Sequence, residues 1–206
     1  IFIEFLFEKL FTYYFYLLVR VKFMTKSLSP RSEPVQSRAR KQREKILKTT
    51  ANLLKTVGLE DLTTILIAEK VGISVGTLYH YFPNKYSILY ALSATWVEKI
   101  HGVIDELGSA DLSEIQLKPL VNSFVGRLSE IYKNNSSLLP LVTVMGSTPE
   151  LEAINDDYLE YIYCHFTQIL MKLPISLEQD DAQYLAIFCW QICHSTLHAV
   201  YCSNLD

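Results

Sequence analysis

The chain has 206 residues, of which 50% are apolar, enough for a buried core in one compact unit or two small ones. Seven glycines, seven prolines and few stretches of alternating polarity argue against a β-rich protein and favour an all-α fold. The net charge of −3 is unevenly placed: residues 24–97 carry eleven Lys or Arg against five Asp or Glu, and residues 98–206 carry five against fifteen. This asymmetry indicates that the front half, rather than the rear half, meets a polyanion.

Residues 1–23 are rich in Phe, Tyr and Leu but are interrupted by charges. Their uncharged run, residues 10–19, is about half of the roughly twenty residues that cross a bilayer, and no secretory signal pattern accompanies it. Because the first methionine is Met24, we expect an upstream extension outside the working protein. The alternative is a membrane-associated helical interaction protein anchored by these residues. Residues 25–36 lack periodicity, and we expect a flexible arm.

A basic run follows, overlapping the start of a helix that Gly58 should end. Its members are Arg38, Arg40, Lys41, Arg43, Lys45 and Lys48. Such a run is often a solvated helix face. Because it directly precedes the motif described next, we expect Arg38, Arg40 and Lys41 to contact DNA phosphates.

Two short helices joined by a tight turn are expected after this run. Thr63 can cap the first, whose apolar residues recur at helical spacing: Ile67, Ala68 and Val71. Gly72 ends it, Ser74 can cap the second, and Pro83 stops the second. This pattern is typical of a helix-turn-helix, whose second helix enters the major groove of DNA. Two packed helices without nucleic acid are the plainer interpretation.

One stretch of the chain reads Gly76-Thr77-Leu78-Tyr79-His80-Tyr81-Phe82-Pro83-Asn84-Lys85, and it is preceded by Ile67-Ala68 and Val71-Gly72-Ile73-Ser74. Together these residues resemble the signature of the TetR family of one-component transcriptional regulators. The resemblance extends from about residue 38 to residue 104. It implies that Thr63 and Ser74 offer a hydroxyl or a helix N-terminus to phosphate. It further implies that Val75, Gly76 and Thr77 lie nearest the bases, that Tyr79 and His80 hydrogen-bond the duplex backbone, and that Lys85 contacts a phosphate.

The second short helix contains no Arg, Asn or Gln, the side chains that discriminate bases through paired hydrogen bonds. We therefore expect modest sequence discrimination from each half-site, sharpened by dimerisation. By the resemblance, the long helix that Asn84 caps links the DNA-binding part to a regulatory part. In this family one more helix often follows the one that should end near Cys202, so the chain end at Asp206 implies a missing end or an abbreviated dimer interface.

Four further helical stretches are expected, at residues 112–132, 137–145, 149–173 and 177–202, with Ser113 and Thr148 as caps and Pro149 at a first helical position. The last stretch has an apolar stripe: Leu185, Phe188, Ile192, Thr196 and Val200. It also has apolar flanks, so one side should face its own core and the other a twin subunit.

Candidate chemistry in the rear half is sparse. Two pairs of possible metal ligands are spaced four residues apart, Cys189 with Cys193 and His194 with His198. The two pairs point in different directions on the helix, so we expect no metal and no cofactor. The four cysteines, without a secretory signal, favour reduced core thiols of a cytosolic protein. No phosphate loop or nucleophile elbow is present, which argues against an enzyme. A small apolar or aromatic effector is expected in a pocket drawn from Trp96, Phe124, Leu128, Met145, Tyr161, His165, Trp190 and His194.

Together these features predict an N-terminal three-helix helix-turn-helix domain and a C-terminal helical bundle. The expected divisions are 1–37, an extension and arm; 38–83, DNA binding; 84–108, a linking helix; and 109–206, effector binding and dimerisation. The expected protein is a cytoplasmic, homodimeric, ligand-released repressor that binds double-stranded operator DNA and no membrane.

Overall fold

The computed structural model describes residues 37–110, 112 and 116–202, and every regular element among them is a helix. In chain order these are α2 (Ser37–Val57), α3 (Thr64–Val71), α4 (Val75–Tyr81), α5 (Lys85–Ser109), α6 (Leu117–Asn134), η1 (Ser136–Leu138), α7 (Leu139–Val144), η2 (Met145–Ser147), α8 (Glu152–Met171) and α9 (Gln179–Cys202). The all-α prediction is confirmed. The predictions for residues 1–36 and for Ser113 lie outside the described residues.

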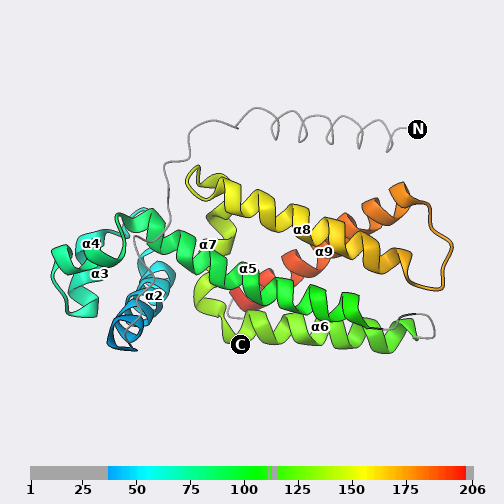
Figure 1. The fold of residues 1–206 in the computed structure, drawn as a ribbon, viewed down its shortest axis with the longest axis horizontal. Helices are drawn as coiled ribbons and strands as arrows, with labels where there is room; N and C mark the ends of the chain where they lie inside the picture. Colours follow the sequence, from blue (N-terminus) through cyan, green and yellow to red (C-terminus); the bar gives the residue numbers. More distant parts are fainter. Residues whose placement is uncertain (1–36, 111, 113–115, 203–206) are drawn as a thin grey trace.

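The first three helices gather at one end of an elongated molecule (Figure 1). The predicted caps are confirmed: Thr63 Oγ1 accepts the Leu66 N–H at 3.1 Å, and Ser74 Oγ accepts the Thr77 N–H at 3.1 Å. Gly72 ends α3 with φ 77°, in the left-handed region that favours glycine. Local signals therefore place the turn between α3 and α4.

Helix α5 runs from this end along the rest of the molecule (Figure 1). It begins with a capping box in which Asn84 Oδ1 accepts the Ser87 N–H at 2.9 Å. The apolar residues that recur along it at helical spacing, from Ile88 to Val103, are buried. One part of α5 packs on α2, and the remainder packs on α6 and α8, so a single rigid element joins the two ends.

Helices α5, α6, α8 and α9 form the bundle. Helix α8 packs on both α5 and α9, and α6 packs on the same two helices. The core between them contains Trp96, Tyr132, Ile162 and Trp190, all fully buried. Within the described residues, no helix is both long enough and apolar enough to cross a membrane.

The predicted start of α8 is wrong by three residues. Thr148 does not cap the helix: its carbonyl accepts the Leu151 N–H at 2.8 Å in a tight turn, and the helix begins at Glu152. Leu151, which directly precedes the helix, is fully buried.

Most of the apolar stripe noted on α9 does not face the core of the bundle. The buried face instead consists of Ala182, Ala186, Trp190 and Leu197. Phe188, Ile192 and Val200 of the predicted stripe are exposed. The buried face thus mixes two small alanines with the large Trp190.

Candidate nucleic-acid interface

A shared core holds the three N-terminal helices together. Its members are Ile46, Leu62, Ile67, Leu78 and Phe82, each with no accessible surface. Helix α4 has seven residues, too short to be stable in isolation, so Leu78 and Phe82 fix it by packing. The opposite face of α4 is thereby presented outward.

The outward face of α4 carries the residues predicted to meet DNA. Gly76, Thr77, Tyr79 and His80 are exposed, and Val75 is half-buried. The hydroxyls of Ser74 and Thr77 are 2.8 Å apart at the start of the helix. Tyr79 has 43% of its surface exposed, so it is available to a partner and not part of the core.

A hydrogen bond joins α3 to Tyr79, a predicted contact residue of α4. The hydroxyl of Tyr79 lies 3.2 Å from Thr64 Oγ1, beside the exposed cap Thr63. This contact orients the phenol ring between the start of α3 and the middle of α4. A phosphate oxygen that met the Tyr79 hydroxyl would therefore also lie near the α3 N-terminus, where free N–H groups favour anions.

Lys85 has a structural task that the sequence did not indicate. Its Nζ donates to the carbonyls of Leu59 and Leu62, both at 3.2 Å, and so holds the segment that leads into α3. An ammonium group has three N–H donors. Two are used here and one is left, so the phosphate contact of Lys85 stays a prediction.

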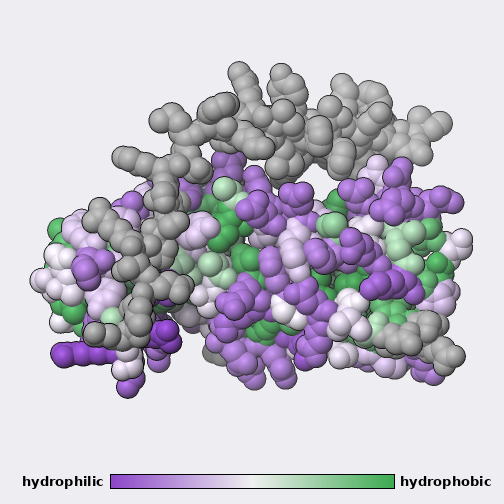
Figure 2. Space-filling model, in the orientation of Figure 1, coloured by the Kyte–Doolittle hydropathy of each residue, from purple (hydrophilic) through white to green (hydrophobic). Residues whose placement is uncertain are grey.

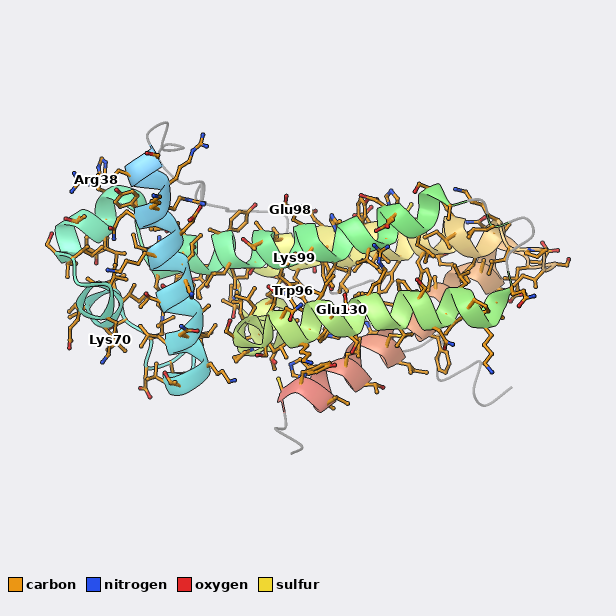
Figure 3. All side chains as sticks on the ribbon, turned by 90° about the horizontal axis from the view of Figure 1, so that it is seen from below. Arg38, Lys70, Trp96, Glu98, Lys99 and Glu130 are labelled. Atoms are coloured by element: carbon orange, nitrogen blue, oxygen red, sulfur yellow. The ribbon has the colours of Figure 1, made fainter. Side chains whose placement is uncertain are left out.

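Two residues of the basic run brace α2 against the neighbouring helices. Lys45 Nζ donates to the Val71 carbonyl at 2.8 Å, and the Arg43 guanidinium lies 5.5 Å from the centre of the Phe82 ring. Both therefore brace α2 against the helix-turn-helix. Arg38, Arg40 and Lys41 are exposed at the start of α2. Hydrophilic side chains project at this end of the molecule, where Arg38 is labelled (Figures 2 and 3).

Ile65 is a candidate contact that the sequence analysis missed. It lies next to Thr64 in the first turn of α3 and is 67% exposed, the most exposed large apolar residue among those described. A signal was present in the sequence, because Ile65 falls off the buried stripe of its helix. A branched apolar side chain in this place suits contact with a thymine methyl group.

The eight residues predicted to form an effector pocket fall into separate groups. Trp96, Phe124, Leu128, Met145 and Trp190 are buried in the bundle. Trp190 stacks on His194 at 6.1 Å between ring centroids. Tyr161 and His165 belong to a different group nearer the surface.

In that second group, the Tyr161 ring lies 3.7 Å from His101 and 3.9 Å from His165, centroid to centroid. The Tyr161 hydroxyl donates to the Asp105 carboxylate, and this hydrogen bond raises the pKa of Tyr161 to about 12. A hollow of about 280 Å³ lies beside Asp105 and His165. The structure thus does not bring all eight predicted residues together.

The cysteines differ from the expectation of core thiols. All four are free, but Cys164 and Cys202 are exposed and Cys189 and Cys193 are half-buried. Burial raises the pKa of Cys189 and Cys193, so neither is activated as a thiolate. In the part of the chain that the structure describes, no three His, Cys, Asp or Glu side chains converge in a way that could hold a metal ion.

Comparisons with known proteins agree on one family. Residues 46–92 match the family model for bacterial regulatory proteins of the tetR family. The chain is 30% identical over 104 residues to the HTH-type transcriptional repressor KstR of Mycolicibacterium smegmatis, covering 50% of each chain. It is 44% identical over 52 residues to the class C tetracycline repressor protein of Escherichia coli, covering 25% of this chain and 24% of that protein. The chain thus spans half or less of the length of these curated relatives.

Comparison with solved structures finds a similar fold in a protein of the same family. A TetR-family transcriptional regulator from Marinobacter aquaeolei VT8 superposes with a TM-score of 0.62 at 20% identity, over 79% of this chain and 83% of that one. The similarity therefore extends beyond the helix-turn-helix to the helices of the bundle.

Proposed function

We propose, because this chain belongs to the TetR family of transcriptional regulators, that it binds double-stranded operator DNA as a homodimer and represses transcription until a small apolar or aromatic effector releases it. The observation that carries the proposal is the outward face of α4, where Thr77, Tyr79 and His80 are exposed while Leu78 and Phe82 hold the helix from behind. A cytoplasmic location belongs to the same proposal.

The exposed side of α9 supports the homodimer. Tyr184, Phe188, Ile192 and Val200 are each about half exposed, on a helix whose other side is buried against α8. Apolar side chains repeated along one helix face favour burial against a partner. Two copies joined there would carry two α4 helices, which suits operator half-sites one helical turn, about 34 Å, apart.

Two contacts support coupling between the bundle and the DNA-binding helices. Helix α5 is continuous between them, and η1 and α7 pack directly on α2. Thr143 of α7 is also hydrogen-bonded to His198 of α9, with 2.8 Å between Oγ1 and Nε2. An effector that favours a different arrangement of the bundle would therefore change the spacing of the two α4 helices by population shift.

In this proposal residues 38–83 form the DNA-binding domain, residues 84–108 the linking helix, and residues 109–206 the effector-binding and dimerisation bundle. The predicted contacts with DNA keep their assigned roles: Arg38, Arg40, Lys41, Thr63, Ser74, Val75, Gly76, Thr77, Tyr79, His80 and Lys85. Ile65 is added to them as an apolar base contact.

The test is selection of bound duplexes from a randomised pool, followed by footprinting of the enriched sequence. We expect an inverted repeat, and a Tyr79→Ala variant that binds every duplex several-fold more weakly with the same sequence preference. A suitable control is Val121→Ala, because Val121 is an exposed apolar residue of α6 that belongs neither to the predicted DNA contacts nor to the exposed side of α9. The proposed interface would be contradicted if no sequence were enriched. It would also be contradicted if Tyr79→Ala lost its sequence preference but kept its affinity for DNA.

A further inference from the structure

The first turns of α3 and α4 lack the side chains that form paired hydrogen bonds with a base. The chain carries no Asp, Glu, Lys or Arg from residue 71 to residue 84, a range that includes all of α4. The charged residues of α3, Glu69 and Lys70, lie at the end of that helix and not at its start. Charged side chains, Asn and Gln are the ones that distinguish bases through paired hydrogen bonds. Any sequence preference of these turns must therefore come from other groups.

The hydroxyl groups near these turns are already engaged in pairs. Thr64 Oγ1 lies 3.2 Å from the Tyr79 hydroxyl, and Ser74 Oγ lies 2.8 Å from Thr77 Oγ1. In each pair one of the two hydroxyl protons is used within the pair, so one is left to donate. A single proton can reach a phosphate or one base atom. It cannot form the paired hydrogen bonds that tell bases apart.

Three side chains with methyl groups lie on the same turns, and we call them the methyl surface: Ile65, Val75 and Thr77. Ile65 is 67% exposed, Thr77 is exposed, and Val75 is half-buried. Thr64, next to Ile65, is hydrogen-bonded to Tyr79, which lies one turn after Val75 on the same side of α4. This bond holds the start of α3 close to α4, beside which it lies in Figure 1.

Gly76 lies within the methyl surface, and nothing in the chain requires a glycine there. Its φ is not positive, so other residues can adopt its backbone conformation. A Cβ atom at this position would meet only Ser74 Oγ, at 3.9 Å, which is an ordinary contact. Glycine is the least favourable residue in a helix after proline, so alanine would suit α4 at least as well. A partner that comes close to the backbone at this point accounts for the glycine.

The surroundings of the methyl surface are basic. Residues 37–85 carry nine Lys or Arg against four Asp or Glu, and Arg38 and Lys41 are exposed at the start of α2. The partner that suits this end of the molecule is therefore a polyanion with apolar groups between its charges. Duplex DNA has such a group in its major groove, because thymine alone among the four bases carries a methyl group there.

We infer that the methyl surface reads thymine: Ile65, Val75 and Thr77 contact the 5-methyl groups of thymines in each operator half-site. Gly76 lets the base pair approach α4 closely enough for these contacts. The inference rests on the proposed function, which supplies the operator. Exposed cations contribute affinity through phosphates, which are the same in every sequence. Sequence preference comes from the buried methyl groups, each of which changes affinity by about fourfold.

The first test uses two randomised duplex pools with the full chain, one made with thymine and one with deoxyuridine in its place. Deoxyuridine lacks the 5-methyl group but keeps the base pairing and the hydrogen-bonding edge of thymine. We expect the thymine pool to yield an inverted repeat with thymines in both half-sites. The same repeat made with deoxyuridine should bind about fifteenfold more weakly, if one methyl contact is lost in each half-site.

A second pair of duplexes separates the methyl group from the other features of thymine. At each thymine whose methyl group matters, the base is replaced by cytosine or by 5-methylcytosine, whose methyl group lies at the same edge of the base. The duplex with 5-methylcytosine should bind about fourfold more tightly than the duplex with cytosine. Equal binding of the two would overturn the inference, because thymine would then be read through its carbonyl oxygen or through DNA shape.

Ile65→Ala removes the most exposed member of the methyl surface. At the thymine that Ile65 contacts, this variant should bind thymine and deoxyuridine duplexes equally, because the two changes remove the same contact. The matched control is Leu117→Ala, since Leu117 is 58% exposed on α6, and it should keep the full preference for thymine. If Ile65→Ala also kept that preference at every position, the inference would fail.

Gly76→Ala tests the close approach. Its thermal midpoint should equal or exceed that of the wild type, because the added methyl group has room within the chain. Its operator affinity should fall by about tenfold, because the same methyl group holds the base pair away. Gly126→Ala, at an exposed glycine of α6 with nothing within 4 Å of the Cβ position, is the control and should bind operator as the wild type does. Wild-type affinity in Gly76→Ala would contradict the inference.

These failures differ from failure of the proposed function. A protein that enriches the same operator from both pools with equal affinity binds DNA as proposed but does not read methyl groups. A protein that enriches no sequence from either pool loses the proposed function and this inference together.

Discussion

At the scale of single residues, neighbouring cations on α2 have different tasks. Lys41 is exposed, whereas Lys45 donates to the carbonyl that ends α3. We expect Lys41→Gln to reduce the salt dependence of DNA binding by about one phosphate contact and to leave stability unchanged. Lys45→Gln should instead lower the free energy of unfolding by about 1 kcal/mol. Salt titrations of DNA binding and urea melts of both variants separate the two tasks, and the reverse pattern would show them to be misassigned.

His194 predicts a pH dependence of stability. Its pKa in the folded chain is lowered to about 4 by burial first and by His198 second, while an unfolded histidine titrates near 6.5. The unfolded chain therefore binds the proton more readily below pH 6.5, and folding stability is lost as the pH falls from about 6.5 to 4.

The comparison variant is His194→Gln, which does not titrate and can still accept from or donate to Tyr132. Between pH 7 and pH 5 the wild type should lose on the order of 2 kcal/mol more than this variant, measured by urea unfolding. His101, whose pKa is also lowered by burial, titrates in both proteins and cancels. Equal losses in the two proteins would mean that His194 is charged in the fold.

At the scale of elements, the start of α5 determines how the two parts of the molecule are joined. Asn84 accepts the Ser87 N–H at 2.9 Å, and the Asn84 N–H donates back to Ser87 Oγ at 3.3 Å. We expect Asn84→Ala to cost about 1 kcal/mol of unfolding free energy in a urea melt. Asn122→Ala, at an exposed position inside α6, is the control and should cost nothing. A null result at Asn84 would show that packing alone fixes this helix start.

At the scale of the whole molecule, the exposed side of α9 is the proposed dimer interface. Phe188 is 58% exposed on that side. We expect Phe188→Glu to shift the sedimentation of the protein from dimer to monomer, because an unpaired carboxylate would be buried in the interface. Operator affinity should fall with it, since one α4 helix reads one half-site.

The control for the dimer is Val121→Glu, which places the same charge on an exposed apolar position of α6. It should sediment as the wild type does. A monomeric wild type would remove the dimer from the proposal, and a dimeric Phe188→Glu would move the interface to another face.

The sequence by itself determined the local features of this protein. The caps Thr63, Ser74 and Asn84, and the left-handed Gly72, act on their own neighbours through hydrogen bonds and backbone geometry, so their roles are readable without a fold. The buried side of α5 follows from helical spacing for the same reason.

Tertiary structure decided which side of α9 is buried, and that Lys45 and Lys85 donate hydrogen bonds to backbone carbonyls. It also decided that the rings of Trp96, Tyr158 and His194 lie in the core of the bundle. Tyr161 and His165 instead stack on each other nearer the surface. Each of these depends on atoms brought together from distant parts of the chain. An apolar residue has the same local pattern whether it faces its own core or the surface, and the approach of the neighbouring helices settles which.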